Sequence, residues 1–153
     1  MGLLRNLRHD TVGRLPLREA VLLKPTAKVR AAIDRMQAKQ LGCAVVVDSE
    51  GAPLGVFSEH CVVQLLLSDP AAIDRDPVKK HLDIRWAIVR QSDNVATVAQ
   101  KMHELDIRFV VVTNEQGLVT AVSGQKGFME FVAEHFPRVM VQRTGGVALK
   151  TRA

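Results

Sequence analysis

The feature that most constrains this chain is an internal repeat, because the second half of the sequence reproduces the apolar pattern of the first half. A shift of 66 residues keeps the pattern in register, and beyond a shared glycine the shift becomes 65. The aligned pairs are Val29 and Val95, Met36 and Met102, Leu41 and Ile107, Val45 and Val111, Gly51 and Gly117, Leu54 and Val119, and Ser58 and Ser123. Since one copy of about 60 residues is marginally stable alone, we expect two copies that share a core.

Each copy predicts the order strand, helix, strand, hairpin turn, strand, helix. Apolar residues at spacings of three and four indicate the helices, which start near 29 and 95 and span 59–67 and 125–135. Runs rich in β-branched residues indicate strands at 21–23, 43–47 and 54–57, and again at 87–89, 109–113 and 118–122. We therefore predict an α/β (α+β) fold of two βαββα repeats packed about a pseudo-two-fold axis, with Val45, Val47, Val56, Val111 and Val119 buried at or near the sheets.

The same elements divide the chain into five parts. We assign an N-terminal segment to 1–15, the first repeat to 16–68, a polar linker to 69–77, the second repeat to 78–136 and a basic tail to 137–153. The tail holds much of the formal charge of +5, with Arg138, Arg143, Lys150 and Arg152 and no acidic residue from 138 onward. It has no aromatic residue for base stacking, so we interpret it as a mobile end or an arm for a protein partner, not as a nucleic-acid site.

Composition and motifs argue against several classes of protein. Hydrophobic residues at 47% and charged residues at 24% are typical of a soluble globular chain, and no apolar run approaches the roughly 20 residues that span a bilayer. The N-terminus does not resemble a secretory signal, so we predict a cytoplasmic protein. Cys43 and Cys61 form no CxxC pair and no zinc spacing, which predicts two buried, reduced thiols and no metal. No catalytic motif is present, so we predict no enzyme activity and no catalytic residue.

The order of elements and the run from Pro53 to Ser58 resemble the CBS domain family, whose tandem pairs are called Bateman modules. The resemblance covers roughly 16–136. The family motif is Gly, two apolar residues, Thr or Ser, two variable residues and Asp. Copy one reads Gly55-Val56-Phe57-Ser58-Glu59-His60-Cys61, and copy two reads Thr120-Ala121-Val122-Ser123-Gly124-Gln125-Lys126. The resemblance implies a regulatory module with a cleft between the copies for an adenosine-containing ligand such as AMP, ATP or S-adenosylmethionine.

Ser58 and Ser123 each stand where a strand passes into a helix, so their hydroxyls and the free amides of the helix face one space that suits an anion. Both serines could instead act only as helix caps. Lys126 at a helix start opposes the helix dipole, which a bound phosphate would relieve; the alternative is a solvated surface lysine. Cys61 is more typical of a core residue than of a ligand contact.

The resemblance adds further candidates. It places Gly55 in the motif, His60 at a position where relatives carry a phosphate-contacting Arg, and Thr26, Ser92 and Asp93 in loops with ribose or phosphate contacts. Thr26 and the Ser92-Asp93 pair could also serve as helix caps. Cys61 and Lys126 replace the motif's Asp, so we expect a phosphorylated ligand that is held by charge more than by ribose recognition.

Two hypotheses of different kinds follow. The first is a stand-alone regulatory pair that senses AMP, ADP or ATP, has no resident cofactor and regulates an unknown partner protein. The second is a ligand-free scaffold for homodimerisation or protein–protein interaction. We predict a homodimer in either case, because the helix 59–67 carries more apolar residues than one core-facing stripe needs. Neither hypothesis involves a membrane or nucleic acid.

Overall fold

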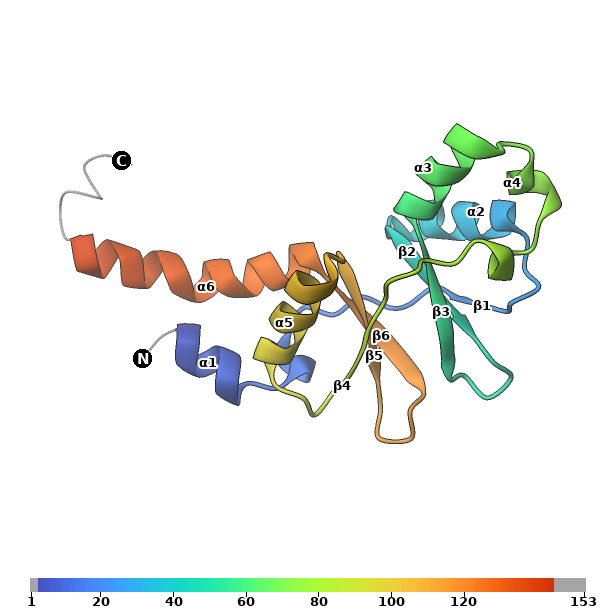
Figure 1. Cartoon of the computed structure of the whole chain (residues 1–153). Coiled ribbons are helices and arrows are strands. Elements are labelled where there is room, and N and C mark those ends of the chain that lie inside the picture. The colour runs from blue at the N-terminus through green and yellow to red at the C-terminus, as the bar shows by residue number, and fades with distance from the viewer. Residues whose placement is uncertain (1–2, 145–153) are drawn as a thin grey trace.

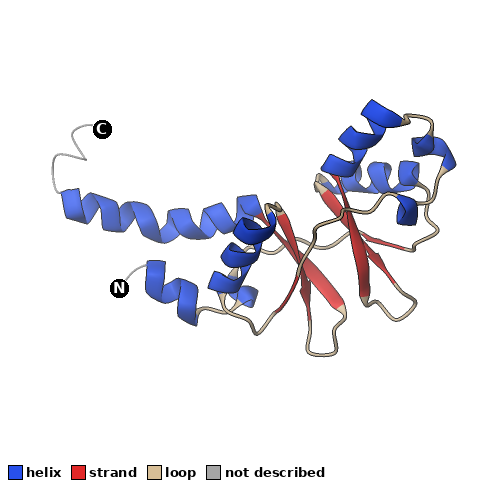
Figure 2. Cartoon of the chain, viewed as in Figure 1, coloured by secondary structure: helices blue, strands red, loops and turns tan. Residues whose placement is uncertain are grey.

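The computed structural model describes residues 3–144, which form two three-stranded sheets that lie next to each other (Figure 2). The first sheet contains β1 (Leu22–Leu23), β2 (Cys43–Val47) and β3 (Pro53–Ser58). The second contains β4 (Ile88–Arg90), β5 (Phe109–Thr113) and β6 (Val119–Gly124). In each sheet the first strand is parallel to the central strand and the third is antiparallel to it. The predicted fold class and the repeated order of elements are therefore confirmed.

The predicted helices cover the outer side of each sheet (Figures 1 and 2). They are α2 (Val29–Lys39) and α3 (Glu59–Ser68) in copy one, and α5 (Val95–Leu105) and α6 (Gln125–Thr144) in copy two. Short helices α1 (Leu3–His9), η1 (Val12–Arg14), α4 (Ala72–Arg75) and η2 (Val78–Lys80) were not predicted. No helix within residues 3–144 is both long and apolar enough to cross a membrane.

The last helix extends well past the predicted end of the second repeat. α6 continues to Thr144, so the first residues of the basic tail are helical, and it contacts α1 from the other end of the chain (Figure 1). The rest of the tail, with Lys150 and Arg152, lies outside the described residues.

Turn and cap residues explain where the helices start and stop. Gly51 and Gly117 have φ values of 94° and 81°, as the hairpin turns require. The expected caps were wrong: α2 follows Lys28 and α5 follows Asn94, because a turn separates Thr26, Ser92 and Asp93 from the helix starts. The Thr97 N–H donates to Oδ1 of Asn94 at 3.0 Å, which satisfies one free amide of the helix.

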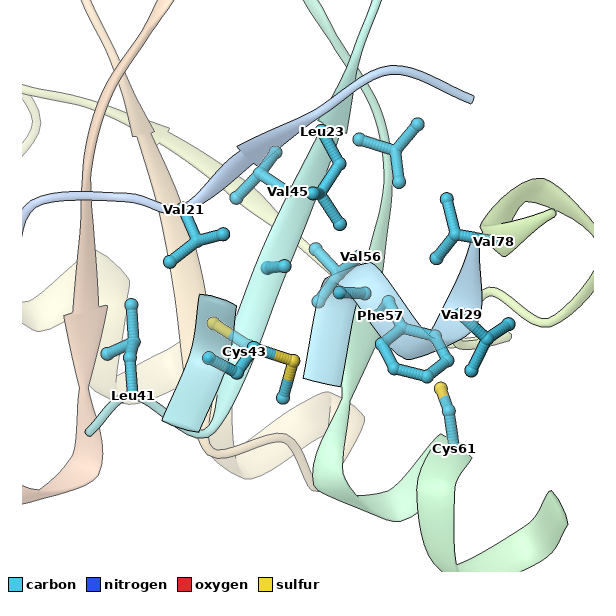
Figure 3. Close-up of a cluster of buried hydrophobic side chains, with 14 of the residues drawn as sticks. Val21, Leu23, Val29, Leu41, Cys43, Val45, Val56, Phe57, Cys61 and Val78 are labelled. Atoms are coloured by element: carbon cyan, nitrogen blue, oxygen red, sulfur yellow. The ribbon is translucent and has the colours of Figure 1, made fainter. Parts of the chain in front are cut away.

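The sheets of the two copies face each other, so side chains of the second copy join the core of the first. Side chains alternate along β5: Val110 and Val112 pack in the second core under the helices, whereas Val111 packs with the first core. Val122 of β6 also packs with the first core. Figure 3 shows the first core, in which Phe57 lies among Val29, Val78 and Cys61. Val45, Val56 and Val111 are buried as predicted, and Val47 and Val119 are half-buried. Cys43 and Cys61 are buried free thiols, also as predicted.

The segment that precedes each copy in sequence packs on the other copy. The Val12 N–H donates to the Asp93 carbonyl at 2.8 Å, so η1 joins copy two although it precedes copy one. At the equivalent place, the Val78 N–H donates to the Ala27 carbonyl at 2.6 Å, which joins η2 to copy one. The linker thus completes the first core and the N-terminal segment completes the second.

Candidate ligand-binding cleft

A cleft of about 860 Å³ lies between the two copies. One wall comes from the end of β3 and the first turns of α3, and includes Ser58 and His60. The other wall comes from copy two, from the segment 82–86 before β4 and from 106–109, where α5 passes into β5. A volume of this size lies within the range of about 300 to 1,000 Å³ that is common for small-molecule sites.

Backbone hydrogen bonds hold several residues that line the cleft. The Glu59 N–H donates to the Gly42 carbonyl at 3.0 Å, and the Gln125 N–H donates to the Arg108 carbonyl at 2.9 Å, which is the equivalent bond of copy two. Gly42 leaves room for the ring of Phe109, because a Cβ at this position would lie 2.9 Å from the ring's Cζ. The close approach of Phe109 to Gly42 thus brings an aromatic side chain of copy two against copy one.

Ser58 ends β3 and starts α3, and its polar atoms contact Cys61. Sγ of Cys61 accepts from the Ser58 N–H at 3.5 Å and lies 3.8 Å from the Ser58 hydroxyl oxygen. Burial is the main cause that raises the pKa of the Cys61 thiol to about 11, and the nearby Asp83 adds to it while the Ser58 amide opposes it. Cys61 is therefore a protonated thiol, and Ser58 keeps a half-buried hydroxyl at the edge of the cleft.

The cleft carries charges of both signs. Arg85 and Arg108 are exposed lining residues of copy two, and among the described residues neither guanidinium forms a hydrogen bond or an ion pair. Glu59 and Asp106 also line the cleft and are exposed, and Asp83 is half-buried. No group of three or more His, Cys, Asp and Glu side chains in the described part of the chain is arranged to hold a metal ion.

Apolar side chains cover the rest of the surface. Trp86, Phe109 and Ile107 are half-buried lining residues, and they can enclose a flat apolar group such as a purine. Ile84 is 97% exposed at the rim. An aromatic and aliphatic surface beside unpaired guanidinium groups can bind a ligand that joins an aromatic ring to an anion.

The structure brings some of the predicted site residues together and separates others. Ser58 and His60 line the cleft. Lys126 follows the lining residue Gln125 and is exposed, but it is not part of the cleft wall. Ser123 is only 1% exposed, so its hydroxyl lies in the interior and does not face this cleft.

The other predicted residues lie elsewhere. Gly55 is buried in β3, where a Cβ would meet Cδ1 of Leu82 at 2.6 Å, so it allows the segment before β4 to approach. Thr26 follows the end of β1, and Ser92 and Asp93 follow the end of β4. Ser58 pairs with the start of β2, which runs parallel to β1, so Thr26 lies at the opposite end of the sheet from Ser58.

Beside the second motif, the segment that enters copy one packs against α6. A Cβ on Gly127 of α6 would lie 2.6 Å from the Pro16 carbonyl oxygen, so the helix packs directly on the chain that enters copy one. Arg18 forms a bridge with Val122 of β6, and its Nη2 donates to the Lys39 carbonyl at 2.8 Å.

Ser123 is buried because it pairs with Val110, whose side chain packs in the second core. The predicted match of Ser58 with Ser123 was wrong, because Ser58 pairs with Cys43 and it is Gly124 that pairs with the equivalent Phe109.

Sequence reasoning missed the copy-two wall, which includes Asp83, Arg85, Trp86 and Arg108. No periodic pattern marks 82–86, which contains no helix or strand. The repeat itself could have indicated this wall. The segment before the first strand of each copy contacts the other copy, so the same contact could be expected at both places. The Arg18 N–H donates to the Val122 carbonyl at 2.9 Å and the Asp83 N–H to the Val56 carbonyl at 2.8 Å, which are equivalent bonds between the copies.

Comparison with known sequences identifies one family. Residues 12–68 match the family model of the CBS domain. No curated protein sequence matches the chain.

Solved structures extend the likeness to both copies. A CBS domain protein from Pyrobaculum aerophilum in complex with AMP is 24% identical, with 81% of this chain and 98% of that chain covered and a TM-score of 0.68. A CBS domain pair in complex with 5′-methylthioadenosine and S-adenosyl-L-methionine is 13% identical, with 82% and 97% covered and a TM-score of 0.72. A CBS-domain-containing protein from Agrobacterium tumefaciens is 20% identical, with 74% and 88% covered and a TM-score of 0.65. At these identities the likeness establishes the fold.

Proposed function

We propose that this chain, whose first copy matches the CBS domain and whose fold is that of CBS domain pairs, is a regulatory module that binds a phosphorylated adenosine ligand in the cleft between its two copies. Binding there involves both copies at once. One wall comes from α3 of copy one, and the other comes from residues 82–86 before β4 and 106–109 after α5 in copy two. A ligand that bridges two walls favours one relative placement of the copies, and a partner protein can respond to that placement.

The observation that carries this proposal is the pair of arginines, Arg85 and Arg108, which line the cleft without a partner among the described residues. A guanidinium forms bidentate hydrogen bonds with phosphate oxygens, and Trp86 beside Arg85 offers a face for a purine. Structures with the same fold have been solved with AMP and with S-adenosyl-L-methionine bound, which supports an adenosine derivative as the ligand class.

The roles of the predicted residues follow from their positions. Ser58 offers a hydroxyl at the start of α3, and His60, the second residue of that helix, lies in the same wall. In this proposal the arginines take the phosphate-binding role expected for Lys126, because Lys126 does not line the cleft. Gly55 contributes only by allowing Leu82 to pack closely.

Calorimetry with adenosine, AMP, ADP and ATP tests the proposal. We expect affinity to increase with phosphate count, and Arg108→Ala or Arg85→Ala to weaken AMP binding by about 1.5 to 3 kcal/mol, as for hydrogen bonds to charged groups. Arg14→Ala is the matched control, because Arg14 is an exposed arginine outside the cleft. Equal binding of adenosine and ATP, or no effect of either cleft variant, would contradict the phosphate role.

The second candidate is a ligand-free scaffold, and one observation favours it. In copy two the chain at Pro16 packs directly against α6 at Gly127, close after the second motif, so this side of the copy serves internal packing. If none of the four compounds binds at millimolar concentration, the scaffold is the better account. Either candidate is compatible with a homodimer and with an unidentified partner protein.

A further inference from the structure

Asp83 differs from the other two carboxylates of the cleft. Glu59 and Asp106 are exposed, whereas Asp83 is half-buried. Its N–H donates to the Val56 carbonyl at 2.8 Å, which holds the segment before β4 against β3, two residues before Ser58. The backbone of copy one therefore fixes the position of a carboxylate that belongs to copy two.

The Asp83 carboxylate lies near the Cys61 thiol, because its negative charge is one of the causes that raise the pKa of that thiol. Burial is the larger cause and brings this pKa to about 11, so Cys61 is a neutral neighbour that does not compensate the carboxylate charge. No cation in the described part of the chain forms an ion pair with Asp83. A carboxylate has about four acceptor positions, and within the described residues no side chain donates a hydrogen bond to that of Asp83, so these positions are open to a ligand.

We infer that Asp83 supplies, from the second copy, a ligand-reading carboxylate that the first copy lacks at Cys61, and that it selects ligands with two adjacent hydroxyl donors, such as a ribose 2′,3′-diol. The two oxygens of a carboxylate can accept from two neighbouring hydroxyl groups at once, whereas a phosphate offers acceptors and negative charge and is repelled. Asp83 thus reads the sugar while Arg85 and Arg108 hold the phosphate. The inference rests on the proposed function, because it assigns specificity within the same cleft.

The test compares AMP with 2′-deoxy-AMP by calorimetry on the full chain. The wild type is expected to bind AMP about tenfold more tightly, as the loss of one hydrogen bond to a charged group predicts. Asp83→Asn is expected to bind the two ligands about equally, and its affinity for 2′-deoxy-AMP is expected to stay within about threefold of the wild-type value. Asp106→Asn is the matched control, because Asp106 lines the same cleft and is exposed, and it should keep the full preference.

Each outcome decides the matter. If the wild type binds AMP without a preference, or if Asp83→Asn keeps the preference, the role of Asp83 is overturned and the proposed function stands. If no adenine nucleotide binds, both are overturned. Should Asp83→Asn fail to fold by circular dichroism, Asp83→Glu keeps the charge and moves the carboxylate by one methylene. A full preference for AMP in that variant would equally overturn the inference.

Discussion

Asp76 is a buried carboxylate at the junction of the linker and copy one. Arg75 donates from Nε to its Oδ1 at 2.9 Å, and Nε2 of His81 lies 2.8 Å from its Oδ2. These hydrogen bonds, the one from Arg75 first, hold the pKa of Asp76 well below its ordinary value against the opposing effect of burial. Its backbone carbonyl also accepts from the Val29 N–H at 3.1 Å, so the residue joins the linker to the start of α2.

We predict that Asp76 makes the fold sensitive to acid. A carboxyl whose pKa is lower in the folded than in the unfolded chain stabilises the fold fully above its unfolded pKa of about 4, and this contribution is lost as pH falls toward the folded pKa. Asp76→Asn should therefore lower the free energy of unfolding at pH 7, and the gap to the wild type should narrow between about pH 4 and pH 2. Urea unfolding across this range measures the gap.

Glu50→Gln is the control for Asp76→Asn, because Glu50 is exposed and its side chain makes no hydrogen bond or ion pair within the described chain. It should leave both the stability and its pH dependence nearly unchanged. A gap between Asp76→Asn and the wild type that stays constant from pH 7 to pH 2 would show that the carboxylate charge plays no part.

At the residue scale, sequence reasoning identified side chains whose position depends on the neighbouring residues in the chain. It missed side chains whose position depends on contacts between distant segments. Ser58 was predicted correctly as the strand-to-helix residue, since an apolar strand and an apolar helix meet there. The burial of Ser123 follows from the register of β6 on β5, which pairs it with the buried Val110, and a local pattern does not reveal that register. The copy-two arginines were missed for the same reason.

At the scale of elements, the short helices η1 and η2 act as equivalent covers of the two cores. Val12 and Val78 are fully buried, Val12 in the second core and Val78 in the first. The repeat therefore reaches back to Asp10 and Asp76, which precede these helices at the same shift of 66. The sequence did not reveal this because a single turn of 3₁₀ helix has no hydrophobic period, so the predicted boundaries divided the chain by sequence order and not by packing.

We predict that each valine protects the copy on which it packs. Val12→Ala and Val78→Ala each remove two buried methyl groups and should lower the free energy of unfolding by about 2 kcal/mol or more. By hydrogen exchange, Val12→Ala should reduce amide protection in α5 before α2, although residue 12 precedes copy one. Val78→Ala is the matched variant and should show the reverse order. Loss of protection in α2 for Val12→Ala would contradict the exchanged packing.

At the scale of the whole molecule, the two copies repeat each other in backbone and differ in what fills the space beside their motifs. Equivalent backbone bonds join Arg18 to β6 and Asp83 to β3. Beside the first motif, however, the chain leaves a cleft of about 860 Å³, whereas beside the second Pro16 contacts α6. The repeat in the sequence predicted the backbone features that the two copies share. The packing in which they differ depends on single residues such as Gly127 and Pro16.

Among the described residues, helix α3 exposes an apolar surface in the monomer. Val63, Leu66 and Leu67 of α3 are 51%, 55% and 84% exposed, and their spacing places them on one face of the helix. We predict that a second copy of the chain covers this face, because an exposed cluster of large apolar side chains favours association. Light scattering should then give about twice the monomer mass of 16.8 kDa. The Leu66→Glu, Leu67→Glu double variant should be monomeric, since glutamate keeps the helix propensity and places charge at the interface.

Leu54→Glu, on β3 and 49% exposed, is the control and should remain dimeric. A wild-type mass near 16.8 kDa at every concentration, or a double variant that still dimerises, would exclude this interface.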